Sequence, residues 1–250
     1  MAKAILLRET GGPEVLRLED VDVRAPGAGE VRLRQTAVGV NFHDCYVRSG
    51  LYKTLKLPGI PGLEAAGTIE AVGPEVANFR AGDRVAYFTA AYGGYASERI
   101  IRAGELVRLP DAIDDRTAAA IMVKGLTAHM LVHLVYQIRP GNRILVHAAA
   151  GGVGTLLCQW ASKLGAEVIG TVGSPEKGEI ARRAGCRHVI LYRSENFVER
   201  VKEITGGKGV DVAYDSVGRD TFLGSLNCLA RLGHLVNFGQ SSGPVAPFEV

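Results

Sequence analysis

A segment near the middle of the chain has the residue types that bind a pyrophosphate. The segment Arg143–Gly154 (RILVHAAAGGVG) begins with apolar, β-branched residues and ends in a glycine-rich turn, and residues 155–165 repeat apolar side chains at helical spacing. A helix N-terminus offers unpaired N–H groups with a partial positive charge, and glycine lets a phosphate come close to the backbone. A strand, a glycine turn and a helix in this order predict dinucleotide binding.

The turn differs from the usual pattern G-x-G-x-x-G. Ala149 occupies the first glycine position, and Gly151 and Gly154 occupy the other two. Counted from Ala148, the segment fits the variant A-x-x-G-x-x-G. The alternative is a tight strand-to-helix turn without a ligand, but the strand and helix that flank it favour a dinucleotide.

The next predicted strand end indicates which dinucleotide is bound. An acidic residue about 20 positions after the glycines usually binds the ribose 2′-OH of NAD. Here Gly173 and Ser174 stand at the strand end, and Glu176 lies beyond them beside Lys177. A small or hydroxyl residue with a nearby cation suits the 2′-phosphate of NADP. The alternative is that Ser174 only caps the next helix and Lys177 is solvated, and both can hold at once.

Metal and disulfide chemistry have weaker signals. His43, Asp44 and Cys45 are adjacent and Glu64 follows, but adjacent side chains point in different directions, whereas zinc needs three or four converging ligands. We therefore expect ordinary turn residues there and no metal. The chain has four cysteines and no C-x-x-C, which argues against a disulfide scaffold and suits the reducing cytoplasm: Cys45, Cys158, Cys186 and Cys228.

The composition is that of a soluble globular protein. The 250 residues are 47% hydrophobic and 22% charged, and the net charge of +3 is not segregated into a basic stripe, so nucleic-acid binding is not indicated. We expect no membrane partner, because no apolar run reaches spanning length and the N-terminus is no signal peptide.

The sequence predicts two domains that position these candidate binding residues. Up to about residue 110 the chain has short alternating strands and turns, which predict a barrel-like β domain. Residues 114–138 are predicted to be helical with a break at Lys124–Gly125, and five strands then alternate with helices, the last strand being Gly233–Asn237. The expected α/β fold has a β domain at 1–120 and a doubly wound parallel sheet at 121–250.

A set of short motifs runs along nearly the whole chain: GGPEVL (11–16), GVNFHDCYVRSGLY (39–52), PGLEAAG (61–67), AGDRV (81–85), KGLTA (124–128), HAAAGGVG (147–154), CQWA (158–161) and YDSVGRDT (214–221). In this order the set resembles the quinone oxidoreductase (zeta-crystallin) family of the medium-chain dehydrogenase/reductase superfamily. The resemblance implies a GroES-like β domain, a Rossmann domain and NADPH in the cleft between them. Zinc-dependent relatives have a cysteine where this chain has Asn41 and a histidine where it has Leu63, and they carry a cysteine-rich loop that this chain lacks. The resemblance therefore implies the zinc-free branch.

The resemblance also implies a set of cofactor-binding residues. His129 and Met130 stand where close relatives often have tyrosines that approach the cofactor, so this contact differs here. The implied residues are Asn41, Phe42, Asp44 and Tyr46 beside the nicotinamide, Thr127 in KGLTA, Gly151, Gly152 and Val153 at the pyrophosphate, Gly173, Ser174, Lys177 and Tyr192 at the 2′-phosphate and adenosine, and Ser216, Phe238, Gly239, Gln240 and Ser241 along the nicotinamide half.

The predicted function is transfer of hydride or electrons from NADPH to a quinone or a conjugated carbonyl. The cofactor carries the chemistry, and no general acid stands out. Tyr46, Tyr52 and Lys124 are the candidates, and Tyr52 can donate a hydrogen bond to a quinone oxygen or simply pack at a domain edge. The alternatives are a non-enzymatic relative that binds NADPH or AU-rich RNA, and an inactive truncated chain.

The chain is shorter than the family pattern. Family members continue for several dozen residues and supply a sixth sheet strand and return helices, so we expect a truncated member with an incomplete sheet. Its last strand would then be an open edge prone to self-association. The family homodimer, which the sixth strand builds, would be lost.

Overall fold

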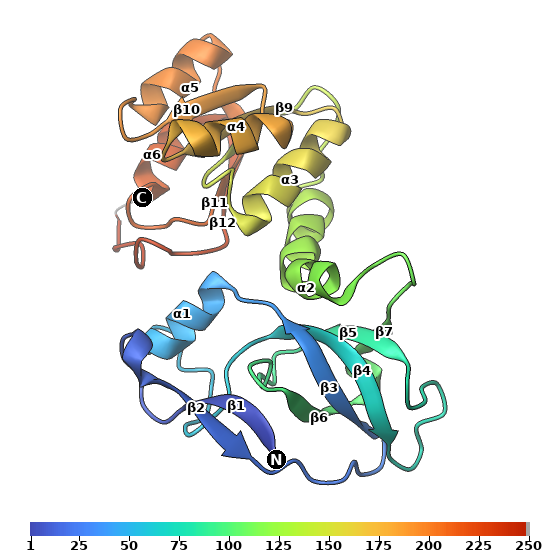
Figure 1. The fold of residues 1–250 in the computed structure, drawn as a ribbon. Coiled ribbons are helices and arrows are strands. Elements are labelled where there is room, and N and C mark those ends of the chain that lie inside the picture. Colours follow the sequence, from blue (N-terminus) through green and yellow to red (C-terminus); the bar gives the residue numbers. More distant parts are fainter. Residues whose placement is uncertain (249–250) are drawn as a thin grey trace. The chain divides into compact units, whose positions relative to one another are not determined.

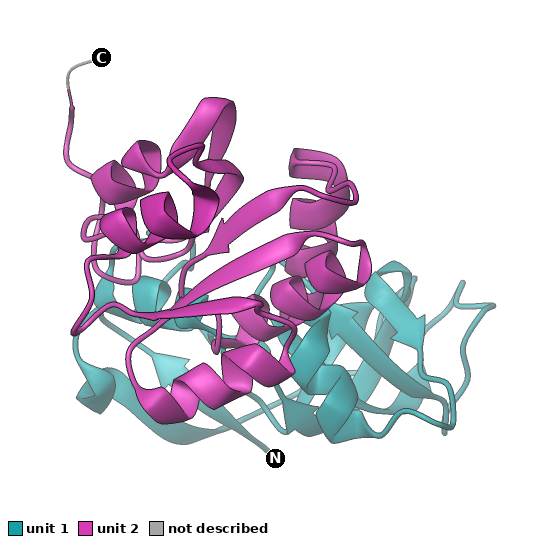
Figure 2. Cartoon of the chain, turned by 90° about the horizontal axis from the view of Figure 1, so that it is seen from above, with its two compact units in different colours: residues 1–123 teal, residues 124–250 magenta. Residues whose placement is uncertain are grey.

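The computed structural model describes residues 1–248 and divides into two compact units, one of residues 1–123 and one from Lys124 onward (Figure 2). The sequence-based domain boundary was placed after residue 120. The first unit is built mainly of antiparallel strands and the second around a parallel sheet. The predicted fold class is confirmed.

The first unit contains a two-stranded and a five-stranded antiparallel sheet (Figure 1). In β3, Val31 and Leu33 are fully buried and alternate with more exposed positions, as a strand with one face on a core requires. The small pair joins β1 (Ala2–Leu7) to β2 (Leu16–Val21). The larger sheet has the order β6 (Glu98–Arg102), β3 (Glu30–Val38), β4 (Glu64–Val72), β5 (Arg84–Phe88) and β7 (Leu106–Arg108), and short 3₁₀ turns lie at Pro13–Val15 and Ala103–Glu105.

Helix α1 (Phe42–Ser49) corrects the prediction that His43–Cys45 are turn residues. Asn41 caps the helix, and its side chain and that of Asp44 form a reciprocal capping box. Gly50 ends the helix in the left-handed conformation, with φ of 80°. The caps at both ends fix where this short helix begins and ends.

Helix α2 (Asp115–Met130) continues without a break through Lys124–Gly125, contrary to the sequence-based prediction. An interior glycine costs a helix about 1 kcal/mol, which packing at both ends offsets. Ala118 and Ala119 lie in the core of the first unit. In the second unit the core contains residues that follow the glycine: Ala128, Leu131 and Val132.

The continuous helix is also longer and more apolar than the sequence-based prediction allowed. Together with the π-helical segment Leu131–Val135, it forms a span of 21 residues with mean hydropathy 1.6, enough by length and composition to cross a membrane. A core helix passes the same test, although only 28% of this apolar window is buried in the structure. The residues that pack into the two cores account for part of its apolar composition.

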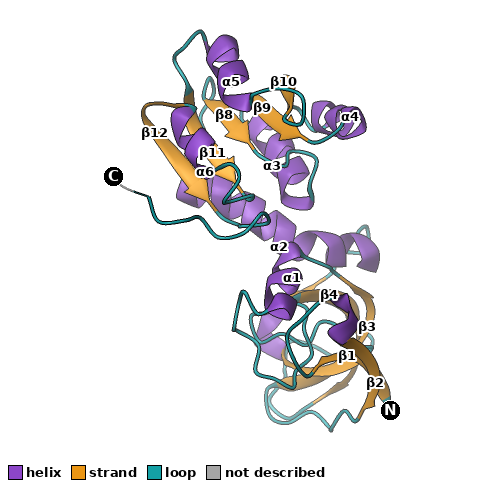
Figure 3. Cartoon of the chain, turned by 90° about the vertical axis from the view of Figure 1, so that its left-hand side faces the viewer, coloured by secondary structure: helices purple, strands orange, loops and turns teal. Residues whose placement is uncertain are grey.

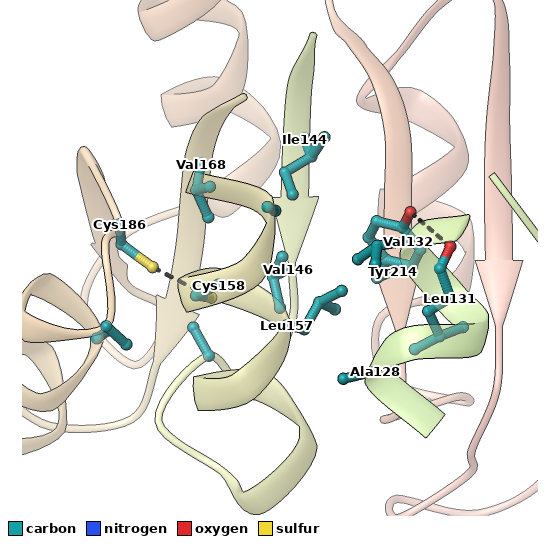
Figure 4. Packing of buried hydrophobic residues seen from close by; sticks show 14 of the residues in the cluster. Ala128, Leu131, Val132, Ile144, Val146, Leu157, Cys158, Val168, Cys186 and Tyr214 are labelled. Carbon is teal, nitrogen blue, oxygen red and sulfur yellow. Dashed lines mark hydrogen bonds between the residues drawn. The ribbon is translucent and has the colours of Figure 1, made fainter. Parts of the chain in front are cut away.

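The second unit is a five-stranded parallel sheet with β8 at its centre (Figures 1 and 3). Alternate residues of β8 face opposite ways: Ile144 and Val146 join the core shared with α3 and the π-helical segment, and Leu145 joins the core shared with α5 (Figure 4). The strand order is β10 (His188–Leu191), β9 (Glu167–Val172), β8 (Arg143–Val146), β11 (Val210–Asp215) and β12 (Leu229–Asn237), and the helices are α3 (Gly152–Lys163), α4 (Pro175–Arg183), α5 (Phe197–Thr205) and α6 (Phe222–Asn227). Buried apolar faces on both sides make this the predicted doubly wound sheet.

Candidate functional site: a dinucleotide pocket and a polar cluster

The glycine turn connects the end of β8 to the start of α3. Gly151 is the N-cap of α3, and no side chain caps this helix end. The turn is closed by the Gly151 N–H, which donates to the Ala148 carbonyl at 2.8 Å, and Ala148 itself adopts a left-handed φ of 50°. The first N–H groups of α3 therefore have neither a helical nor a side-chain partner, which is the arrangement that binds a phosphate.

The glycines of this turn have different structural roles. A β-carbon on Gly154 would overlap the Ala148 carbonyl oxygen and lie 2.9 Å from Ala149 Cα, so this glycine permits the helix to start against the strand end. A β-carbon on Gly152 would meet only the aliphatic part of the Lys124 side chain, at 2.8 Å. The helix start is thus open at Gly152, where a bound group can approach the backbone.

A pocket of about 520 Å³ lies beside this turn at the carboxyl ends of the parallel strands. This is the place where open α/β sheets bind their ligands. Five residues of the sequence-predicted set line it, namely Gly151, Gly173, Lys177, Tyr192 and Ser241. The other lining residues were not in the predicted cofactor-binding set, although some belong to the motifs noted in the sequence: His147, Ala148, Ala150, Thr171, Val172, Phe197, Val217, Asp220, Thr221 and Ser242.

The end of β9 brings cations and a hydroxyl group to one side of the pocket. A β-carbon on Gly173 would lie 2.7 Å from Tyr192 Oη and 3.6 Å from Arg193 Nε, so both side chains lie close to this glycine. Ser174 caps α4 and accepts a hydrogen bond from the Lys177 N–H at 3.4 Å. The positive charges of Lys177 and Arg193 and the hydroxyl of Tyr192 suit the binding of a phosphate ester. Arg193 was missed in the sequence, although its position next to Tyr192 was a usable signal.

A buried network under the pocket holds the strand ends together. His147 is 2% exposed, and its Nδ1 and Nε2 lie 2.9 Å from Thr171 Oγ1 and Ser225 Oγ. The Ser225 hydroxyl donates to the buried Asp215 carboxylate at 3.0 Å. Burial lowers the pKa of His147 to about 4, while Asp215 opposes the shift, so the imidazole is neutral at pH 7. The network joins the ends of β8, β9 and β11 to α6.

The loops that follow β11 and β12 carry most of the residues predicted to contact the nicotinamide half of the cofactor. The Ser241 N–H donates to the Ser216 carbonyl at 3.2 Å, and a β-carbon on Gly239 would lie 2.8 Å from the same oxygen. The loop after β12 therefore packs on the loop after β11. The other predicted residues of this unit lie on the same loop or on helices: Phe238 and Gln240 follow β12, Val153 is in the first turn of α3, and Thr127 is on α2.

In the first unit, Asp44 is the centre of a buried polar cluster. Its Oδ2 accepts from the Asn41 N–H at 2.8 Å and from the Tyr95 hydroxyl at 2.6 Å, while its Oδ1 is buried and has no partner in the structure. Burial raises the pKa of Asp44. The Asn41 side chain donates to the fully buried Glu64 at 2.7 Å, and Glu64 also accepts from the Val123 N–H at 2.6 Å. The orphaned oxygen suits a hydroxyl or amide donor of a ligand.

Aromatic rings gather along α1 beside this cluster. The ring of Tyr46 lies 5.3 Å from that of Phe42 and 4.9 Å from that of Tyr52, centroid to centroid. His43 packs 5.3 Å from Tyr52, and its Nε2 lies 3.0 Å from Tyr92 Oη, which also bonds Thr54. Two candidate acids, Tyr46 and Tyr52, are thus together, while Lys124 belongs to the second unit.

The pocket residues of the second unit fit a phosphorylated dinucleotide. Over residues 1–248 no group of three or more His, Cys, Asp or Glu side chains gathers as a metal site. An open helix N-terminus and the cations beside Gly173 are matched to the anionic groups of such a cofactor. Asp220, a carboxylate in the pocket lining, is neutralised by Arg219 at 2.9 Å.

Known proteins share this sequence and fold. Residues 27–111 match the family described as alcohol dehydrogenase GroES-like domain, and residues 152–250 match the one described as zinc-binding dehydrogenase. A quinone oxidoreductase of Pseudomonas aeruginosa is 52% identical over 245 residues, which are 98% of this chain and 75% of that protein. A 2-haloacrylate reductase of a Burkholderia species is 46% identical over 255 residues, which cover 100% of this chain and 77% of the relative. The crystal structure of Escherichia coli quinone oxidoreductase complexed with NADPH is similar with a TM-score of 0.96 and 48% identity, covering 100% of this chain and 76% of that one.

Proposed function

Because the chain belongs to the quinone oxidoreductase family of the medium-chain dehydrogenase/reductase superfamily, we propose that it is an NADPH-dependent reductase of quinones or conjugated carbonyls. The observation that carries the proposal is the pocket at the carboxyl ends of the parallel strands, with its open helix N-terminus and its cationic side. NADPH, when bound, supplies the hydride.

The residues of the second unit have distinct binding roles in this proposal. The N–H groups at the start of α3, around Gly152, hold the pyrophosphate. Lys177, Tyr192 and Arg193 hold the 2′-phosphate through charge and hydrogen bonding. His147 keeps the strand ends in register around the pocket and, being neutral, adds no charge to it.

The residues of the first unit orient the reacting groups. Asp44 Oδ1, which is buried and unpartnered in the structure, has the capacity to accept one more hydrogen bond from a donor group. Phe42, Tyr46 and Tyr52, whose rings are tilted against one another, offer ring faces and edges to a planar acceptor, and the two tyrosines add phenol hydroxyls. Tyr52 donates a hydrogen bond to the acceptor oxygen on which negative charge develops.

A second acceptor class is favoured by one comparison. The 2-haloacrylate reductase is nearly as similar to this chain as the named quinone oxidoreductases are. A haloacrylate carries a carbon–carbon double bond conjugated to a carboxylate, so a site that reduces it accepts anionic as well as neutral conjugated acceptors. We place the protein in the cytoplasm and its substrate among small molecules.

The test is NADPH consumption by the purified chain with 1,4-benzoquinone, 9,10-phenanthrenequinone and 2-chloroacrylate as separate acceptors. We expect turnover with at least one acceptor, and a loss of about tenfold in kcat/KM for Tyr52→Phe, corresponding to one hydrogen bond to developing charge. Tyr136→Phe, on a loop of the second unit, is the matched control. NADPH binding with no turnover of any acceptor would refute the proposed activity.

A further inference from the structure

Two buried cysteines of the second unit lie with their sulfur atoms in contact. Cys158, on α3, and Cys186, just before β10, have Sγ atoms 3.4 Å apart although they are 28 positions apart in the sequence (Figure 4). Cys158 is fully buried and Cys186 is 6% exposed. Nothing in the proposed reduction of quinones uses either thiol.

The surrounding backbone holds these side chains close together. A β-carbon on Gly185 would lie 2.7 Å from the Ser162 β-carbon and 3.4 Å from the Cys158 carbonyl oxygen, so the turn before Cys186 packs directly on α3. The Cys186 N–H donates to the Ala181 carbonyl at 3.0 Å, which fixes the turn to α4. A disulfide needs a sulfur–sulfur distance of about 2.05 Å, so the two sulfur atoms, now 3.4 Å apart, must approach by about 1.4 Å to form the bond.

From this geometry we propose that Cys158 and Cys186 form an oxidation site that hydroperoxides convert to an intramolecular disulfide. The Cys186 thiolate attacks the peroxide, giving a sulfenic acid and hydroxide. The Cys158 thiol then displaces water from that sulfenic acid, and its proton leaves with the water oxygen. The hydroxide takes up the proton that Cys186 lost on forming the thiolate. With hydrogen peroxide, two thiols are therefore oxidised to a disulfide and one peroxide is reduced to two waters, and no other reactant is needed.

The order of attack follows from the different surroundings of the two thiols. The hydrogen bond between the pair lowers the pKa of Cys186, and the same contact together with burial raises the pKa of Cys158. Cys186 is also the more exposed of the two, so a small oxidant meets the better nucleophile first. Cys158 is then the resolving thiol at contact distance.

The bond would fasten α3 to the turn between α4 and β10 without entering the dinucleotide pocket. Neither cysteine lines that pocket, and both belong to the hydrophobic core of the second unit. We therefore expect the oxidised protein to bind NADPH within about twofold of the reduced protein's affinity. Closing a loop of this length should stabilise the fold enough to raise the melting temperature by about 10 °C.

The experiment treats the purified 250-residue chain with hydrogen peroxide, blocks the remaining thiols in denaturant and maps the peptides by mass spectrometry. We expect two of the four cysteines to become unavailable to the blocking reagent, with one cross-linked peptide pair containing Cys158 and Cys186, reversed by dithiothreitol. Cys228→Ala, another buried cysteine of the same unit, is the matched control and should leave the cross-link unchanged.

Several results would overturn the proposal. They are four blockable thiols after oxidation, a cross-link that involves Cys45 or Cys228, or Cys186 converted to a sulfinic acid while Cys158 stays reduced. A lower melting temperature of the oxidised form would show that the native fold does not accommodate the bond. Since the main measurement uses the unsubstituted chain, it does not depend on whether Cys186→Ala folds.

Discussion

Two glycines of one turn should respond oppositely to a small side chain. Gly152→Val places a branched side chain at the open start of α3, where the nearest protein atoms are the flexible methylene groups of Lys124. Gly154→Ala places a methyl group against the backbone of Ala148 and Ala149, which cannot move without rebuilding the turn. The first substitution should affect the ligand and the second the fold.

The magnitudes follow from these contacts. Overpacking against fixed atoms lowers the free energy of unfolding by about 3 kcal/mol. The higher helix propensity of alanine over glycine raises it by about 1 kcal/mol. Gly154→Ala should therefore lower the free energy of unfolding by about 2 kcal/mol. For a chain of this size, that loss lowers the melting temperature by about 4–8 °C. Gly152→Val should change it by less than about 2 °C, yet weaken NADPH binding at least about a hundredfold, because the branched side chain occupies the space of a phosphate.

Thermal unfolding followed by circular dichroism, and NADPH fluorescence titration, measure the two effects separately. Gly104→Ala, in a turn of the first unit where a β-carbon meets no atom within 4 Å, is the control for glycine replacement itself. Unchanged NADPH affinity in Gly152→Val would mean that the phosphates bind elsewhere. Full stability of Gly154→Ala would mean that α3 does not start against the strand end as described.

Three other outcomes are expected. The chain should prefer NADPH over NADH by at least about tenfold, and Lys177→Glu should remove most of this preference; equal binding of both cofactors by the unsubstituted chain would contradict the assignment. Activity should survive chelator treatment, and stoichiometric zinc in elemental analysis, with activity lost on its removal, would contradict this. The free energy of unfolding in urea should fall as the pH drops from about 6.5 to about 4, because the folded pKa of His147 is lowered and the unfolded chain binds the extra proton. His147→Gln should flatten this decline, whereas an unchanged slope would show that His147 is not its source.

The parallel sheet was predictable because its strands are apolar runs bounded by glycine turns. Such a pattern depends on neighbouring residues only, and Ile144–Val146 followed by Gly151 and Gly154 is an example. Helix α1 was missed because it has only 8 residues, FHDCYVRS, which is too short a stretch for helical periodicity to be recognised. Its capping residues, Asn41 and Gly50, were visible in the sequence, but capping residues are weaker evidence for a helix than apolar periodicity is.

Features that depend on distant residues could not be predicted. His147 is positioned by Thr171 and Ser225, which lie 24 and 78 positions away, so its neutral, buried state appears only in the folded chain. The contact between Cys158 and Cys186 is of the same kind, since a count and spacing of cysteines indicated only that no disulfide scaffold was present. The continuity of α2 through Gly125 depends on packing at both of its ends.

The central position of β8 has a consequence for the order in which the second unit can assemble during synthesis. β8 pairs with β9, which follows within one helix, but its other partner is β11, with Tyr214 beside Val146. Until β11 leaves the ribosome, the apolar strand β8 is the open edge of a three-stranded sheet, β10-β9-β8. Pairing over so long a stretch of chain is slow, and an apolar edge that waits for its partner is exposed to other chains. The strand that carries the dinucleotide turn is therefore the part of the nascent chain most in need of protection by a chaperone.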